Sequence, residues 1–363
     1  MTEPAIPYGR QTIEQDDVDA VAEVLQGDWL TQGPSVDAFE TAIAEHVGAR
    51  HAVAFSSGTA GLHGAAFAAR LGPGDLLVSS PLTFMASVNC GRYVGASIGL
   101  VDIDPATWNI NLENVPDEAD AVVAVHYAGL PVDLTRFNRR PRVVIEDAAH
   151  ALGAFTPDGP VGNCARSDLC VFSLHPVKPI TTAEGGVVTT NDDELADRMR
   201  RFRSHGIERM PGRGGWHYEI AELGFNYRLT DLQAALGTSQ LQKLDRFIAR
   251  RNEIADRYRV LLADLPVTLP PAAPPGWTHG YHLFPVLVDD RARVFESLRA
   301  AGIGVQVHYV PVHHHPISTD IGLKPGDLPA CDGVYDHLIS LPMFPRLADT
   351  DQDRVVETLA ALV

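Results

Sequence analysis

Two apolar runs joined by a proline-rich loop constrain this chain more than any other feature. Residues 169–172 are apolar and typical of a buried strand, and a second apolar run starts after the glycine pair at 185–186, which favours a sharp bend. The prolines at 176 and 179 exclude a helix across Lys178, which lies between them. The pattern therefore predicts a rigid loop that carries Lys178 at the end of a strand.

A lysine in this setting has two interpretations. Desolvating an ammonium group is costly, so a lysine held beside buried strands suggests a chemical role, and forming a Schiff base is the leading one. A surface lysine on an ordinary turn explains the same letters. This stretch alone does not separate the two.

An acidic residue upstream bears on that choice. Residues 142–147 form another apolar run, and it ends at Asp147. A carboxylate there could pair with the ring nitrogen of pyridoxal phosphate (PLP) and keep it protonated, although an acid at a strand end is more often a turn or helix cap. Taken together, Asp147 and Lys178 favour the cofactor interpretation.

The motifs around these two residues resemble the DegT-type family of sugar aminotransferases, which are fold type I PLP enzymes. The resemblance runs along the whole chain. The matching stretches are Asp147-Ala-Ala-His150, Ser173-Leu-His-Pro-Val-Lys178-Pro-Ile-Thr-Thr-Ala-Glu-Gly-Gly, Ile6-Pro-Tyr8-Gly, Trp29-Leu-Thr-Gln-Gly33, Phe225-Asn-Tyr-Arg-Leu-Thr-Asp231 and Gly304-Val-Gln-Val-His308-Tyr309.

The resemblance implies an activity. It indicates a homodimer with shared active sites that moves an amino group from glutamate to C4 of a nucleotide-linked 4-keto-6-deoxy sugar. Within the family, the motif sequences are most similar to those of transaminases that form UDP-4-amino-4,6-dideoxy-N-acetyl-β-L-altrosamine on the pseudaminic acid route. An aminotransferase of dTDP-keto-6-deoxyhexoses, from an antibiotic or surface-sugar pathway, is the alternative.

The resemblance also implies roles for particular residues. Lys178 is the expected catalytic residue and the cofactor's attachment point. The expected cofactor contacts are Gly58, Thr59, Ala60, Phe84, Asp147, His150, Ser173 and, from the neighbouring subunit, Asn226. The expected substrate contacts are Tyr8, Trp29, Leu30, Thr31, Arg228, His308 and Tyr309.

The stretch 56–61 supports a phosphate site from its own chemistry. Small residues follow a short apolar run at 51–55, and a strand-to-helix turn of this kind leaves backbone N–H groups free at a helix N-terminus, where phosphate binds well. A plain capped helix would need the same residues. Beside Lys178 and Asp147 we interpret it as a phosphate site with Thr59 and Ala60 as contacts.

The order of apolar runs predicts the fold. Runs at 51–55, 75–80, 97–104, 120–127, 142–147, 169–173 and 187–190 alternate with crossovers, which predicts a mainly parallel sheet with helices on both faces. We expect a large cofactor-binding domain at 1–245 and a smaller C-terminal α+β domain at 246–363.

Other elements are predicted from periodicity and composition. Helices are expected at 12–26, 193–204, 291–301 and 350–362, and one long helix at about 230–262. Residues 207–224 are rich in glycine and are predicted to be a loop. Further strands of the small domain are expected at 281–288 and 305–309.

Bulk properties exclude several classes of partner. A net charge of −17 disfavours nucleic acid and anionic membranes, and neither a long apolar run nor a signal segment is present, so we expect a cytoplasmic protein. The four cysteines fit neither a zinc site nor a disulfide framework. No metal is expected at His313-His-His315 either, because three adjacent histidines cannot all face one ion.

Two further functions agree less well with these residues, because Lys178 is present and the set of Asp147, Ser173 and Lys178 is intact. A dehydratase of the same family would carry histidine where this chain has Lys178. A non-catalytic, PLP-binding regulatory protein is the alternative from another class, and an absorption band that shifts when glutamate is added would distinguish an enzyme from it.

Overall fold

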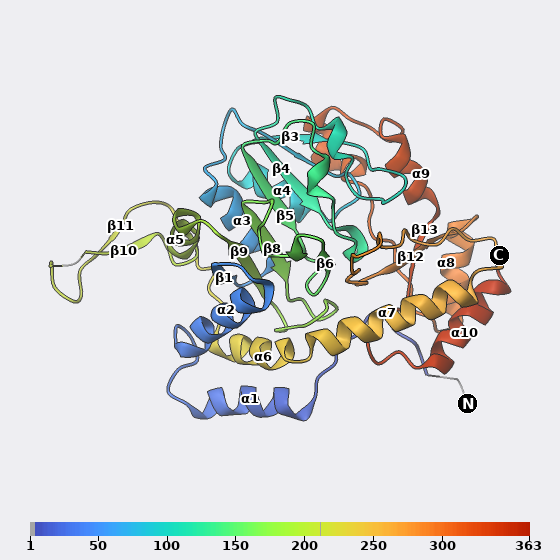
Figure 1. Ribbon diagram of the computed structural model, residues 1–363, viewed down its shortest axis with the longest axis horizontal. Coiled ribbons are helices and arrows are strands. Elements are labelled where there is room, and N and C mark those ends of the chain that lie inside the picture. The colour runs from blue at the N-terminus through green and yellow to red at the C-terminus, as the bar shows by residue number, and fades with distance from the viewer. Residues whose placement is uncertain (1–3, 211) are drawn as a thin grey trace.

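The structure is a computed structural model that describes residues 4–210 and 212–363, and a seven-stranded sheet lies at its centre (Figure 1). The strand order is β1, β9, β8, β5, β4, β2, β3. Strand β9 runs antiparallel to both of its neighbours, and the other neighbouring strands pair in parallel. This confirms the predicted mainly parallel α/β fold.

The helices and strands have the following bounds. The helices are α1 Gln15–Gln26, α2 Pro34–Val47, α3 Gly58–Ala68, α4 Ala86–Tyr93, α5 Asp193–Phe202, α6 Asp231–Leu241, α7 Leu244–Leu261, α8 Arg291–Ala300, α9 Pro329–His337 and α10 Asp349–Ala360. The strands are β1 His51–Phe55, β2 Leu76–Ser79, β3 Ser97–Leu100, β4 Ala121–Val125, β5 Val143–Asp147, β6 Phe155–Thr156, β7 Gly159–Pro160, β8 Leu169–Ser173, β9 Gly186–Thr190, β10 Ile207–Arg209, β11 Tyr218–Ile220, β12 Phe284–Leu287 and β13 Leu338–Leu341.

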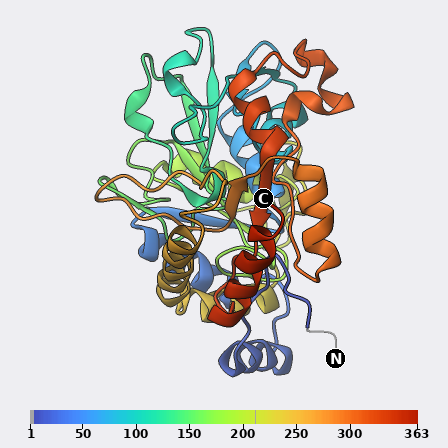
Figure 2. The ribbon, with the colours of Figure 1, turned by 90° about the vertical axis from the view of Figure 1, so that its right-hand side faces the viewer.

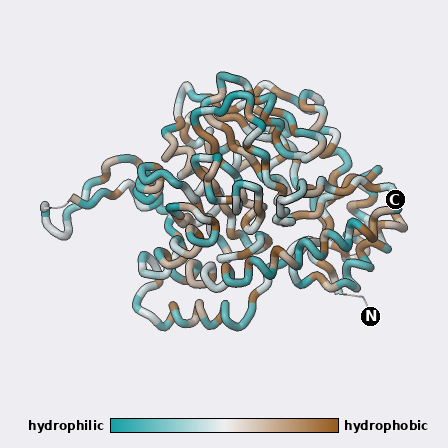
Figure 3. Tube along the Cα trace, viewed as in Figure 1, coloured by the Kyte–Doolittle hydropathy of each residue, from teal (hydrophilic) through white to brown (hydrophobic). Residues whose placement is uncertain are grey.

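The central part of the chain trace is largely hydrophobic (Figure 3), and the sheet contributes to an apolar cluster on each face, where helices cover it. In β1, Ala52 and Ala54 pack into a cluster with α2 and α6, whereas Val53 and Phe55 pack into a second cluster with α3 and α5. Successive residues of a strand point to opposite faces, so an unbroken apolar run serves both clusters. The carboxyl ends of the parallel strands then meet at one edge.

Helix α1 begins later than predicted, at Gln15. The Glu14 side chain accepts from the backbone N–H of Asp17, and the Asp17 side chain accepts from the Glu14 N–H, which forms a capping box. Helix α2 was not predicted. It begins at Pro34 and ends at Gly48, whose φ of +76° suits a glycine.

The long helix predicted at 230–262 is wrong in one respect, because it is two helices. Helix α6 ends at Leu241 and α7 begins at Leu244. At the break, the Lys243 ammonium is buried, lies 2.8 Å from Asp17 Oδ1 of α1 and donates back to Ser239. This contact lies far away in sequence, so local periodicity could not reveal it. Helix α7 then runs from below the sheet to the C-terminal part (Figure 1).

The loop predicted at 207–224 contains a two-stranded hairpin, β10 paired antiparallel with β11, and the loop prediction is wrong there. The hairpin projects from the body of the molecule (Figure 1), and we call residues 207–210 and 212–223 the arm. Its strands are mostly exposed, and Trp216 and Leu223 are 82% and 77% exposed. A strand that buries neither face leaves no apolar alternation in the sequence, which explains the missed strands.

The C-terminal part of the chain (orange and red in Figure 2) has an apolar core cluster of its own. The cluster contains residues of β12, β13, α8 and α10, together with Ile6 from the N-terminal segment. The strand predicted at 305–309 is wrong, because only Gln306 forms a bridge, to Ser340, and the run is held by side-chain packing. The boundary at 245–246 stays a prediction: Phe247 of α7 packs with the sheet helices, and Tyr258 packs with the C-terminal cluster.

Within the part of the chain that the structure describes, none of the helices combines the length and apolar character needed to span a bilayer.

Candidate active site

The Lys178 loop connects β8 to β9 and is closed at its base. The Leu174 N–H donates to the Gly185 carbonyl at 2.9 Å, directly beyond the last residue pair of the two strands. The Lys178 N–H donates to the His175 carbonyl, also at 2.9 Å. This tight turn is the rigid, non-helical loop that the two prolines predict, and it brings the partly buried Lys178 side chain to a cavity.

Asp147 is the last residue of β5 and is buried. Its Oδ2 accepts a hydrogen bond of 2.6 Å from Ser87 Oγ, and its Oδ1 accepts one of 3.2 Å from the Ala149 N–H. The Ser87 hydroxyl in turn lies 2.7 Å from Thr83 Oγ1. A buried carboxylate is thus fixed by a short chain of buried hydroxyl groups.

Lys178 and Asp147 line the same cavity, which has a volume of about 440 Å³. Its walls come from the ends of β4, β5 and β8, the start of α3, the segment before α4, and the C-terminal part. The lining residues are Tyr8, Ser57, Gly58, Thr59, Leu62, Thr83, Phe84, Ala86, Val125, Asp147, Ala149, His150, Val171, Ser173, His175, Val177, Lys178, Glu184, His282, His308 and Tyr309.

The start of α3 packs closely against the Lys178 loop. A Cβ on Gly58 would lie 3.0 Å from the Ser173 Cβ, and a Cβ on Gly186 would lie 2.4 Å from the Ser57 carbonyl oxygen. A side chain at 186 would clash with backbone, so this position requires glycine, and a Cβ at 58 would be tightly packed. The Ser57 hydroxyl caps the helix by accepting from the Ala60 N–H at 3.1 Å. The start of α3 is therefore a capped helix, as the sequence allows, and it also forms part of the cavity wall.

Histidines and tyrosines form one part of the cavity wall. His150 Nε2 and the Tyr309 hydroxyl share a hydrogen bond of 3.0 Å, and the His282 ring lies 4.5 Å from the His150 ring, centre to centre. The Tyr127 hydroxyl donates to the His308 carbonyl at 2.5 Å and ties this wall to the end of β4.

Burial controls the charge of these groups. Desolvation, followed by the nearby Lys178 charge, holds the pKa of His150 and His282 well below the usual range and lowers the pKa of His308 to about 4. Desolvation also raises the pKa of Tyr309. The wall is therefore neutral at physiological pH.

Lys178 is shifted in the direction that favours a nucleophile. Desolvation of its ammonium lowers its pKa to about 8, and the Asp147 carboxylate opposes that shift. A usable fraction of Lys178 is then neutral near pH 7, as a Schiff base requires.

The structure brings together most, but not all, of the residues predicted for the site. Those that line the cavity are Tyr8, Gly58, Thr59, Phe84, Asp147, His150, Ser173, Lys178, His308 and Tyr309. Those that do not line it are Ala60, Trp29, Leu30, Thr31, Asn226 and Arg228.

Ala60 of α3 is buried in the core, whereas the other outlying residues lie around the start of α6. Asp231, at the start of α6, accepts from the backbone N–H groups of Gly33 and Ser35 and so fixes the loop that carries Trp29 to Thr31. Thr31 forms a bridge with Thr230. Trp29, Leu30, Thr31 and Asn226 are exposed, near the base of the arm or of α6.

Sequence reasoning missed several cavity residues: Thr83, Ser87 behind it, His175, Glu184 and His282. His175 and Glu184 lie inside the quoted Lys178 motif, so that motif was the available signal for them. Thr83 and Ser87 flank the start of α4, and nothing in their spacing points to Asp147, which lies on another element. His282 follows Tyr281 in an apolar run, so the sequence suggests a buried structural residue there.

The cavity fits PLP. It offers a lysine with a lowered pKa, a buried carboxylate for the ring nitrogen, an exposed aromatic residue (Phe84) for the ring face, and a helix start that approaches the lysine loop closely. The buried Nδ1 of His150 has no hydrogen-bond partner among the described residues. Polar groups of this kind are commonly satisfied by a bound ligand.

Comparisons with known proteins agree with this geometry. SpsC of Bacillus subtilis, a spore coat polysaccharide biosynthesis protein, is 36% identical over 99% of this chain and 97% of its own. PseC of Helicobacter pylori, an aminotransferase involved in pseudoaminic acid biosynthesis, is 31% identical with a TM-score of 0.91 over 98% of both chains. The PLP form of Spr1654 of Streptococcus pneumoniae, a sugar aminotransferase by its description, is 26% identical with a TM-score of 0.91 over 99% of this chain and 98% of that one.

The family comparison covers nearly the whole chain, residues 11–360, and so includes both the sheet that carries Lys178 and the C-terminal part that closes the cavity. The chain belongs to the DegT/DnrJ/EryC1/StrS aminotransferase family and is a PLP-dependent sugar aminotransferase.

Proposed function

We propose that this aminotransferase moves an amino group from glutamate to C4 of a UDP-linked, N-acetylated 4-keto-6-deoxy sugar, forming UDP-4-amino-4,6-dideoxy-N-acetyl-β-L-altrosamine. The observation that carries the proposal is the similarity to PseC along 98% of both chains. The segment 304–309, whose sequence resembles the family motif, supplies His308 and Tyr309 to the cavity that Lys178 also lines, so it is suited to hold the sugar.

The cofactor has a place for each of its parts in this proposal. Ser173, Gly58 and Thr59 hold its phosphate, Phe84 covers its ring, and Asp147 keeps its ring nitrogen protonated. Bound PLP supplies an electron sink for the electron pair released at the substrate carbon.

Lys178 is the proposed acid and base for proton transfer at the reacting carbon. Lys178 Nζ would hold PLP at rest, and with an amino donor bound its neutral amine would take the proton from the donor's α-carbon and give it up again on the cofactor side. The pKa of about 8 keeps both of its protonation states accessible near neutral pH. The neutral wall formed by His150 and Tyr309 adds no charge that would hold the proton elsewhere.

A second copy of the chain completes the site in this proposal. Lys178 is the only lysine or arginine among the described residues that line the cavity, yet glutamate has two carboxylates and a nucleotide sugar has a diphosphate. The arm exposes Trp216 and Leu223, so it offers apolar surface that a second chain could cover. We place Asn226 and Arg228, and the loop that carries Trp29, Leu30 and Thr31, at the partner's cavity, within a two-fold dimer.

The dTDP-linked sugars remain the second candidate, because a few hydrogen bonds to hydroxyl groups distinguish such substrates and each is worth about 1 to 3 kcal/mol. Purified enzyme should be given equal amounts of the UDP-linked N-acetylated ketosugar and a dTDP-4-keto-6-deoxyhexose, with glutamate, and the products identified by mass spectrometry. We expect the UDP product to dominate. Preference for the dTDP sugar would overturn the substrate proposal and leave the family assignment intact.

A further inference from the structure

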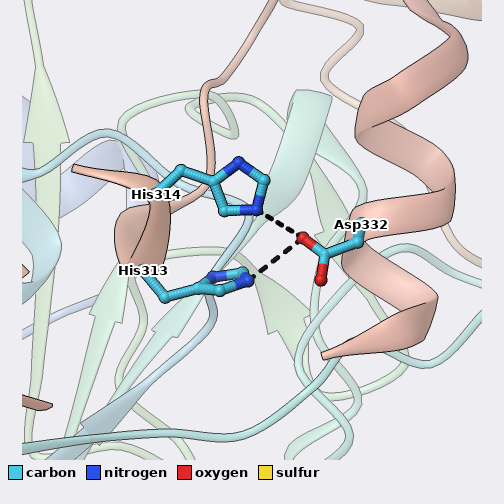
Figure 4. A group of neighbouring side chains, drawn as sticks. All are labelled: His313, His314 and Asp332. Atoms are coloured by element: carbon cyan, nitrogen blue, oxygen red, sulfur yellow. Dashed lines mark hydrogen bonds and ion pairs between the residues drawn. The ribbon is translucent and has the colours of Figure 1, made fainter. Parts of the chain in front are cut away.

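A cluster of metal-binding side chains lies outside the active site, where the chain carries three consecutive histidines. His313 and His314 belong to a short 3-10 helix, η4 (Val312–His314), and Asp332 belongs to α9 (Figure 4). His313 Nε2 and His314 Nε2 lie 3.0 Å and 2.6 Å from the same carboxylate oxygen, Asp332 Oδ1. The ligand atoms of all three residues lie within 4.8 Å of one another.

The expectation that three adjacent histidines cannot share one ion does not exclude this arrangement. The turn of η4 sets the rings of His313 and His314 nearly perpendicular, at 79°, and directs one nitrogen of each to the same point. His315 is not part of the group, and the third donor comes from Asp332, on another element. No sequence spacing between 314 and 332 suggests this ligand.

Two imidazole nitrogens and one carboxylate oxygen are a donor set suited to Zn²⁺ and similar late transition metals. With metal–ligand bonds of about 2.0 to 2.2 Å, donors around one tetrahedral ion stand roughly 3.3 Å apart. The distances to Asp332 Oδ1 are 3.0 Å for the His313 nitrogen and 2.6 Å for the His314 nitrogen, so binding an ion requires shifts of roughly 0.3 Å and 0.7 Å. Three protein ligands leave a fourth position for water.

The residues around the cluster fix the Asp332 carboxylate and leave the site accessible to an ion from solvent. The Gly326 N–H donates to Asp332 Oδ2 at 2.8 Å, which fixes the orientation of Oδ1 as outer partners of metal ligands do. The His313 side chain is fully buried, whereas those of His314 and Asp332 are 16% and 13% exposed. The cluster is thus closed on one side and open to solvent on the other.

His313 is also incompletely satisfied. Its Nδ1 is buried and has no hydrogen-bond partner among the described residues, so Asp332 is its one polar contact. A bound ion would add a strong bond to a buried ring that is otherwise weakly held.

We propose that His313, His314 and Asp332 bind one Zn²⁺ or similar transition-metal ion, which joins α9 to the segment that follows His308 and Tyr309. The Val312 N–H donates to the Pro81 carbonyl at 2.9 Å, shortly before Thr83 and Phe84. The ion therefore stiffens a stretch of chain that supports two walls of the active-site cavity. This role is structural, and it holds whichever sugar the enzyme uses.

The test uses Co²⁺ as the probe, because its visible absorption reports coordination geometry. Holoenzyme is stripped with a chelator, freed of unbound cofactor and titrated with Co²⁺, with the bound metal counted by elemental analysis. We expect one ion per chain with the intense bands of tetrahedral cobalt, and binding at least tenfold weaker in His314→Ala and in Asp332→Asn. His315→Ala, from the same histidine run, is the matched control and should bind as wild type does.

Unfolding temperatures in chelator confirm that each variant is folded, and Zn²⁺ should raise that temperature in wild type and in His315→Ala only. The proposal is wrong if wild type binds no stoichiometric ion, or if His314→Ala and Asp332→Asn leave the affinity for the ion unchanged. In either case the cluster is a hydrogen-bonded triad only.

Discussion

Ser87 Oγ lies 2.6 Å from Asp147 Oδ2, and both residues are buried. Ser87 lies in the first turn of α4, and Asp147 is the last residue of β5. This hydrogen bond therefore connects the carboxylate expected under the cofactor to helix α4. The relationship makes Ser87 a positioning residue for Asp147.

Replacing Ser87 by Ala should slow transamination about 5- to 30-fold, because the lost hydrogen bond leaves a buried carboxylate less well held, at a cost of about 1 to 2 kcal/mol. Ser87→Thr, which keeps the hydroxyl, should recover most of the rate. Steady-state kinetics would be compared with those of Ser79→Ala, a buried serine whose hydroxyl donates to the Val123 carbonyl outside the cavity. Equal rates in Ser87→Ala and wild type would rule the role out.

Lys178→Ala should abolish turnover, because no other amine lines the cavity within the described residues. Borohydride reduction of the wild-type holoenzyme, followed by peptide mapping, should find the cofactor on Lys178. The chain's other lysines are Lys243 and Lys324, so the assignment is unambiguous. Label on either of those two would contradict it.

The uptake of PLP by cofactor-free enzyme should speed up with rising pH and level off above about pH 8, because only the neutral Lys178 amine attacks and each pH unit below its pKa reduces that form about tenfold. The Asp147 carboxylate raises this pKa, so the midpoint should move to lower pH in Asp147→Asn. Stopped-flow absorbance measures both midpoints. A midpoint that stays fixed or moves upward in Asp147→Asn would show that the two charges do not interact as described.

Mixing two inactive variants tests the shared dimer site. Lys178→Ala and Asn226→Asp should each be nearly inactive, the second because it sets a carboxylate against the cofactor phosphate. After random subunit exchange, half of the dimers are mixed and each has one complete site, so activity should recover to about a quarter of wild type.

The matched control for this experiment mixes Lys178→Ala with Asp147→Asn. Both residues line the cavity of one chain, so no mixed dimer has a complete site and no activity should return. If the Asn226→Asp mixture also stays inactive, Asn226 serves its own chain.

Lys243→Met should destabilise the protein by about 3 to 5 kcal/mol, because it leaves the buried Asp17 carboxylate without its cation. Adding Asp17→Asn should restore part of that loss. Denaturant unfolding measures both, and Lys324→Met, at an exposed lysine, should change the free energy of unfolding by less than about 0.5 kcal/mol. A loss no larger than that of Lys324→Met would mean that the pair contributes little.

The sequence predicted those parts of the fold that local patterns determine. The apolar runs became the strands of the main sheet because both faces are covered, as Val53 and Ala54 show by packing on opposite sides. The prolines beside Lys178 predicted its non-helical loop. The position of Asp147 at the end of a predicted strand indicated where the cavity lies, because the ends of parallel strands converge at one edge of the sheet.

Features that depend on distant contacts were not predictable in this way. The break between α6 and α7 accompanies the contact of Lys243 with Asp17 from the other end of the domain. The strands of the arm bury neither face, so they carry no periodic signal, and His282 enters the cavity only through the packing of the C-terminal part. Asp332 likewise meets His313 through tertiary structure alone.

Because the Leu174 N–H bonds to the Gly185 carbonyl and the Thr182 N–H to the Leu174 carbonyl, the Lys178 loop begins and ends at one point of the sheet. Two contacts tie this loop to the rest of the molecule: Ile180 lies in the core shared with α2 and α6, and the Gln233 side chain of α6 donates to the Glu184 carbonyl at 2.6 Å. A loop grafted at residues 175–184 from another enzyme must therefore keep an apolar residue at 180 to place its lysine at the cavity.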